Sequence, residues 1–104
     1  MQRSGHRVDF ADMRAAIRHE PHAQRFVIDS DGAAALLQYR KLDELTLDFN
    51  HTYVPAAQRG GGVASRLTEH ALHYAREHRL KVVPSCPFVA VFIERHPEYR
   101  DLLA

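Results

Sequence analysis

Residues 45–64 read LTLDFNHTYVPAAQRGGGVA, and this stretch decides the fold. Hydrophobic and polar residues alternate from Leu45 to Val54, which is typical of a β-strand with one buried face. Pro55 has no backbone N–H for strand pairing, so we expect the strand to end there. Three glycines at 60–62 form a loop, and apolar residues then recur at helical spacing to about Arg79. The stretch therefore predicts a strand, a glycine-rich loop and a helix, in this order.

The alternation also predicts which side chains share a face of the strand. One face is expected to carry Leu45, Leu47, Phe49, His51 and Tyr53, and the other Thr46, Asp48, Asn50 and Thr52. A histidine among core residues is either a hydrogen-bonded core group or a base that faces a cleft. Both interpretations of His51 stay open on the spacing alone.

The flanking sequence predicts further strands and helices. Upstream, two β-rich runs separated by an Asp-Gly turn predict an antiparallel meander with the strand at 45–54. Those runs are Arg25–Asp29 and Ala33–Arg40, with a second turn at Lys41–Glu44. Downstream we expect a short strand at 80–84, a helix from Pro87 to about His96, and a last helical turn or two at 98–103. Residues 11–18 fit either a short helix or a strand that ends before Pro21, so 1–20 are poorly predicted.

Length and composition point to one folded domain over residues 1–104. The chain has 45% hydrophobic and 26% charged residues and a net charge of +1, so no basic field favours nucleic acid or an anionic membrane. No apolar run approaches the roughly 20 residues of a membrane helix, and the first residues lack a signal peptide's apolar stretch. One cysteine excludes an internal disulfide and a multi-cysteine zinc site. We therefore expect a cytoplasmic protein.

The glycine loop has the properties of an anion cradle. Glycines at 60–62 let a ligand approach the backbone closely, and the helix that follows presents unpaired N–H groups and a partial positive charge. Arg59 adds a cation. These features suit a phosphate or pyrophosphate. The loop has neither the Lys-Ser/Thr of a Walker A motif nor GxGxxG spacing, and a plain turn before a helix is the alternative.

Cys86 and two histidines are further candidate reactive groups. In Pro84-Ser85-Cys86-Pro87, a proline at the first helical position would make Cys86 the N-cap. The helix dipole would then favour its thiolate, which suits a nucleophile, whereas a buried, inert cysteine is the alternative. His70 and His73 are three residues apart on the predicted helix and no third ligand is evident, so we expect no metal.

Several of these segments together resemble a known family. Arg59-x-x-Gly62-x-Ala64 at the start of a helix is similar to the acyl-CoA loop of GCN5-related N-acetyltransferases. The small YjdJ-type acetyltransferase-like branch is the narrower resemblance. It extends over about residues 25–103 and rests on these segments: Arg25-Phe26, Tyr39-Arg40, His51-Thr52-Tyr53-Val54-Pro55, Arg59 to Ala64, Ala75-Arg76, Lys81 to Val89, and His96-Pro97-Glu98-Tyr99.

The resemblance implies an α+β fold. A compact, mixed and mainly antiparallel sheet would carry one long helix after the glycine loop and one or two short C-terminal helices. A V-shaped opening between two strands would receive acetyl-CoA. The resemblance places the pantetheine arm along the strand and the pyrophosphate on the loop amides. The implied cofactor-binding residues are Asn50, Thr52, Val54, Arg59, Gly60, Gly61, Gly62, Val63 and Ala64.

The activity implied is acetyl-CoA-dependent N-acetyl transfer, with His51 and Cys86 in the active site. His51 would remove the amine proton during direct transfer, or Cys86 would accept the acetyl group first. An acyl-CoA-binding module with little turnover, and a small scaffold whose loop is only a turn, are the alternatives.

The chain departs from larger members in lacking helices after the first strand, so the identity of the acceptor amine stays open: it is a small molecule, a peptide or a protein. We expect no metal, nucleic-acid or membrane partner, and a monomer or weak dimer.

Overall fold

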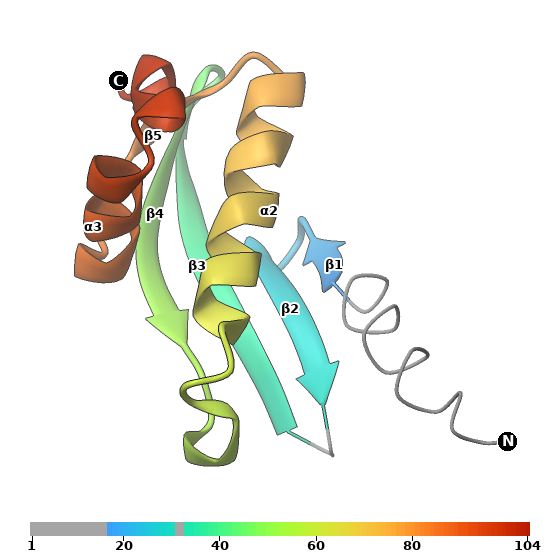
Figure 1. Ribbon diagram of the computed structural model, residues 1–104. Coiled ribbons are helices and arrows are strands. Elements are labelled where there is room, and N and C mark those ends of the chain that lie inside the picture. The colour runs from blue at the N-terminus through green and yellow to red at the C-terminus, as the bar shows by residue number, and fades with distance from the viewer. Residues whose placement is uncertain (1–16, 31–32) are drawn as a thin grey trace, which may run out of the picture.

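A five-stranded sheet forms the frame of the protein in the computed structural model, which describes residues 17–30 and 33–104 (Figure 1). The strands lie in sequence order: β1 (Ile17–Glu20), β2 (Arg25–Ser30), β3 (Ala33–Asp43), β4 (Thr46–Tyr53) and β5 (Lys81–Val83). The first four are antiparallel, and β5 pairs with β4 in parallel. The predicted α+β class with a mixed, mainly antiparallel sheet is therefore confirmed.

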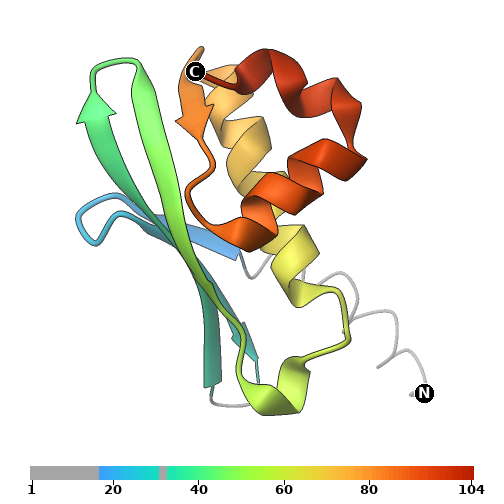
Figure 2. The same ribbon diagram turned by 90° about the vertical axis from the view of Figure 1, so that its left-hand side faces the viewer.

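The described helices cover one face of this sheet and leave the other open (Figure 2). They are η1 (Ala56–Gln58), α2 (Val63–Glu77), α3 (Pro87–Arg95) and η2 (Pro97–Leu102). The buried side of α2 alternates leucines with alanines, among them Leu67, Ala71 and Ala75, and alanine lets the helix approach the sheet closely. Its apolar stripe meets Phe26, Ile28 and Leu37 in one core. None of the described helices has the length and apolarity needed to cross a membrane.

A β-bulge in β4 changes which residues face the helices. Phe49 pairs with Tyr39, but the next pair along the ladder joins His51 to Gln38, so Asn50 is the extra residue. Thr52 then pairs with Leu37, whose side chain is fully buried in the core. Cross-strand partners share a face, so the bulge brings Thr52, and not His51, to the face covered by the helices.

The pairing of β4 with β5 is short and opens into a fork. It runs from Thr46 to Asp48, where Asp48 is opposite Val83. One further hydrogen bond joins the Cys86 N–H to the Phe49 carbonyl at 2.9 Å. Beyond that point β4 continues to Tyr53, while the segment that follows β5 turns into α3. On its far side β5 is covered by the C-terminus, where Ala104 N–H donates to the Val82 carbonyl.

Most predicted boundaries hold, and two differ for physical reasons. β3 extends to Asp43, where a turn was predicted from Lys41, because 41–43 pair with the start of β4. The α2 helix ends at Glu77, since Arg79 takes a left-handed φ of 58°. Residues 17–20 form a strand that ends before Pro21, which matches the strand alternative for this region. The rest of that prediction lies at 1–16, outside the described residues, as does the turn at 31–32.

Candidate functional site

The glycine loop adopts a conformation that requires glycine at two positions. Gly60 and Gly62 have φ values of 86° and 80°, in the left-handed region that L-residues disfavour. A Cβ at either position would meet no atom within 4 Å. The backbone conformation, and not crowding, therefore demands these glycines, and the surface of the loop is open. Gly62 is also the N-cap of α2.

A cavity of about 310 Å³ opens beside this loop. Six of the predicted cofactor-binding residues line it: Val54, Arg59, Gly60, Gly62, Val63 and Ala64. Gln58, Ser65 and Phe88 also line it and were missed. Ser65 and Gln58 adjoin the motif, so their position in the sequence could have indicated them. Phe88 is on α3, and only the packing of α3 beside the loop brings it there.

The electrostatics of the cavity favour an anion. The first backbone N–H groups of α2 have no partners within the helix, and the first turn carries no acidic side chain. Arg59 donates from Nε to the Val54 carbonyl at 3.0 Å, which ties the loop to the end of β4 while the residue stays exposed. The cavity therefore combines helix N–H donors with a cation at its edge.

Cys86 is the N-cap of α3 with Pro87 after it, as the sequence predicted. The residue is only 6% exposed. Its thiol donates to the Thr52 hydroxyl, with 3.5 Å between Sγ and Oγ1. This contact spans the fork between β4 and α3. Val54 is two residues after Thr52, and Phe88 is two residues after Cys86. Both line the glycine-loop cavity, so the fork and the cavity adjoin.

The expected position of His51 on the apolar face of the strand is wrong. Period-two alternation put His51 beside Phe49, but the extra residue Asn50 reverses the phase of the strand. His51 is exposed and pairs with Gln38 on the open face of the sheet. Tyr53, which alternation also placed on the core face, is 46% exposed for the same reason. His51 thus lies on the open face of β4, whereas Cys86 contacts Thr52 on the face that the helices cover.

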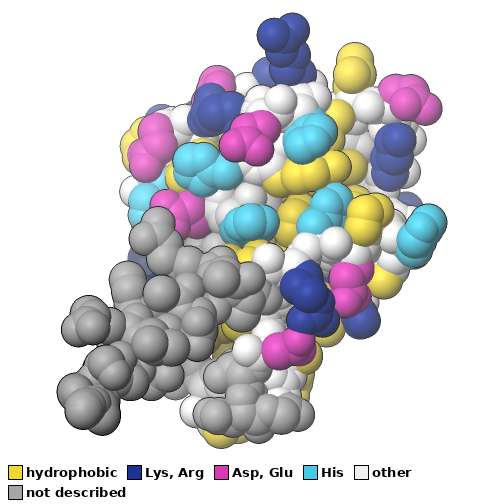
Figure 3. Space-filling model, turned by 90° about the vertical axis from the view of Figure 1, so that its right-hand side faces the viewer, with side chains coloured by type: hydrophobic (Ala, Val, Ile, Leu, Met, Phe, Trp, Pro, Cys, Tyr) yellow, Lys and Arg dark blue, Asp and Glu magenta, His cyan; other side chains and the backbone are white. Residues whose placement is uncertain are grey.

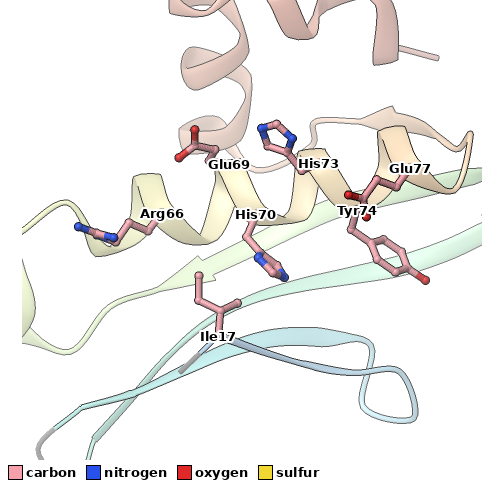
Figure 4. A pocket seen from close by; sticks show the side chains of 7 residues that line it. All are labelled: Ile17, Arg66, Glu69, His70, His73, Tyr74 and Glu77. Atoms are coloured by element: carbon pink, nitrogen blue, oxygen red, sulfur yellow. The ribbon is translucent and has the colours of Figure 1, made fainter. Parts of the chain in front are cut away.

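A second cavity, of about 430 Å³, lies beside α2, where Ile17 of β1 faces His70 (Figure 4). Its lining residues are Ile17, Arg66, Glu69, His70, His73, Tyr74 and Glu77. Histidine side chains gather on this side of the molecule (Figure 3). His70 packs edge-on against Phe26, and the His73 Nε2 is 3.0 Å from the Tyr99 hydroxyl. Within residues 17–30 and 33–104 no three potential ligands converge in a metal-binding group.

Burial lowers the pKa of two histidines near this cavity. The His19 ring stacks on Phe26 with 4.4 Å between centroids, and its Nε2 is 2.6 Å from the Tyr39 hydroxyl. Loss of solvent lowers the pKa of His19, and the nearby His70 adds to this effect. The pKa of His70 is also lowered, again chiefly by burial. His19 also packs edge-on against Tyr74, so these rings pack β1 and β2 against α2.

Comparison with known proteins gives consistent results. Residues 25–102 match the family model described as GCN5-related N-acetyl-transferase. Protein NATD1 of Danio rerio is 31% identical over 92 residues, covering 85% of this chain and 84% of the relative. Protein NATD1 of Homo sapiens is 29% identical over 83 residues, covering 78% and 74%. A GCN5-like protein from Staphylococcus aureus, solved by NMR, superposes with a TM-score of 0.63 at 27% identity, covering 85% of this chain and 86% of that chain.

Proposed function

Because this chain belongs to the GCN5-related N-acetyltransferase family, we propose that it transfers the acetyl group of acetyl-CoA to an amine. Family membership supports an acetyl-transfer role. The observation that carries the finer proposal is the cavity at the glycine loop, which adjoins the fork between β4 and α3. The cavity and the fork lie end to end, and this arrangement suits a long thioester that carries a pyrophosphate.

In this proposal the pyrophosphate of CoA binds the loop from Arg59 to Ala64. The helix N–H groups donate to its oxygens and Arg59 supplies a positive charge. The pantetheine arm follows Asn50–Val54 towards the fork. Backbone N–H groups of β4 near the bulge are suited to polarise the thioester carbonyl.

We propose direct transfer with His51 as the base. The open face of β4 is reachable for an acceptor, and His51 is exposed there. An ammonium acceptor first loses a proton to His51, and the neutral amine then attacks the thioester carbonyl. The C–N bond forms, the C–S bond breaks and the CoA thiolate takes up the proton that the nitrogen loses. The products are the N-acetyl amine and CoA, with one proton released through His51.

The relay through Cys86 is the second mechanism. Its support is the position of Cys86 as the N-cap of α3, beside the fork. Against it stand the low exposure of the residue and the engagement of the thiol with Thr52. Direct attack is therefore the mechanism that the placement of the side chains supports better.

Calorimetric titration with acetyl-CoA tests the binding step. We expect micromolar affinity, weakened about tenfold by Arg59→Met, since a hydrogen bond to a charged group contributes about 1.5 kcal/mol or more. Arg95→Met is the matched control, because Arg95 is exposed in the last turn of α3. No binding at millimolar acetyl-CoA would contradict the proposal. Binding without amine-dependent release of CoA would instead identify an acyl-CoA-binding module.

A further inference from the structure

Asp48 has an unusual hydrogen-bonding environment for a carboxylate among the described residues. Its Oδ1 is buried and has no hydrogen-bond partner among the described residues. Glu20, Asp29 and Asp101 each pair with an arginine. Asp43 accepts a hydrogen bond from the Leu45 N–H at 2.8 Å. The buried oxygen of Asp48 thus lacks a hydrogen-bond donor among the described residues.

The position of Asp48 links it to the fork. It is the last residue of β4 that pairs with β5, opposite Val83, so the strands separate immediately after it. On its other side it pairs with Arg40 of β3. Arg40 and Gln38 alternate with the buried Tyr39 and Leu37, which places their strand partners Asp48 and His51 together on the open face.

Asp48 and His51 are therefore consecutive open-face positions of β4, separated by the bulge. Neighbouring positions on one face of a strand are about 7 Å apart, a separation that lets two side chains reach one nitrogen atom between them. Asp48 as a whole is half-buried, although its Oδ1 is buried. No described helix covers that face (Figure 2).

An unpartnered buried carboxylate oxygen is unfavourable for the folded protein by itself. Such a group is better explained by a ligand that completes its hydrogen bonding. The ligand must donate N–H or O–H groups and gains from a positive charge. An alkylammonium ion has three donors and one charge, and it is the protonated form of an amine acceptor.

We propose that Asp48 binds the ammonium group of the acceptor and so selects amines that are cations at neutral pH. This inference rests on the proposed function. Asp48 acts as a specificity-determining residue: it holds the acceptor nitrogen at the fork, beside His51, which takes the first proton. Alkylamines such as a lysine side chain fit this site. Arylamines, which are uncharged at neutral pH, gain nothing from the carboxylate.

NMR titration of the ¹⁵N-labelled full chain with n-butylammonium chloride tests the site without requiring turnover. We expect shifts of the backbone amides at residues 48–51, with and without CoA, and no such shifts with n-butanol. Asp48→Asn should weaken binding at least fivefold. Asp43→Asn is the matched control, since its amide oxygen still accepts from Leu45 and its position is at the far end of β3.

Two results would overturn the inference. One is the absence of shifts at residues 48–51 in the unsubstituted protein. The other is equal binding by Asp48→Asn, which is expected if Arg40 neutralises Asp48 in solution. Failure of the proposed function is separate, because it appears as absent acetyl-CoA binding by calorimetry. Where turnover is measurable, Asp48→Asn should raise KM for butylamine about tenfold, with kcat and the KM for aniline little changed.

Discussion

The thiol of Cys86 and the hydroxyl of Thr52 contact each other across the fork, with 3.5 Å between Sγ and Oγ1. Alternation along the strand had assigned Thr52 to the polar face and His51 to the core face. The contact depends on the opposite arrangement, which the bulge at Asn50 creates. One inserted residue therefore decides which side chain of β4 meets the N-terminus of α3.

Replacement of Cys86 by alanine separates the two mechanisms. With direct transfer, Cys86→Ala should keep kcat/KM within about threefold and lose about 1 kcal/mol of stability from the smaller buried side chain. Intact-mass measurement of the unsubstituted protein after incubation with acetyl-CoA should show no acetyl group on Cys86. An acetylated Cys86, together with loss of activity in the alanine variant, would establish the relay instead.

Replacement of His51 by glutamine should impair the chemical step alone. We expect kcat to fall about 100-fold, the low end of the contribution of a general base, while acetyl-CoA affinity and thermal stability stay unchanged because the side chain is exposed. His22→Gln, in the exposed turn between β1 and β2, is the control. Equal activity of the two variants would remove His51 from the mechanism.

The two kinds of glycine in the loop should respond differently to alanine. Gly62→Ala forces an L-residue to a φ of 80° and should lower the free energy of unfolding by about 1 kcal/mol. At Gly61, which does not have a positive φ, a new Cβ would lie an ordinary 3.5 Å from the Gln58 carbonyl oxygen. Gly61→Ala should therefore leave stability nearly unchanged. Urea denaturation of both variants checks this, and equal losses would contradict the assigned conformation.

Stability should fall as the pH drops below about 6.5. Burial lowers the folded-state pKa of His19 and His70 from the ordinary value of 6.5. Below that pH the unfolded chain binds more protons than the folded protein, so the free energy of unfolding decreases with falling pH. The loss begins near pH 6.5 and continues towards the lower folded-state pKa values.

His19→Phe tests this assignment, because it keeps an aromatic ring on Phe26 and removes a titrating group. Denaturation at a series of pH values from 7.5 to about 5 should give a shallower slope for this variant. His22→Gln again serves as control and should keep the original slope. A slope unaffected by His19→Phe would assign the acid sensitivity to other groups.

Much of the fold was predictable because its signals are local. Glycines before a helical apolar pattern predicted the loop and α2, and Pro87 placed the start of α3 with Cys86 as its N-cap. The loop residues that line the cavity were found for the same reason. Phe88 was not, because it reaches the cavity only through the packing of α3 beside the loop, which no spacing in the sequence encodes.

The amino-acid sequence by itself determined the order of the elements, the glycine cradle and the family resemblance, since each depends on residues close together in the chain. The tertiary structure decided which face of β4 each side chain occupies. Strand pairing sets that register, and the extra residue Asn50 shifts the period-two pattern by one position. Pairing between strands thus separated His51 from Cys86, joined Thr52 to Cys86, and placed Asp48 beside His51 where β4 and β5 part.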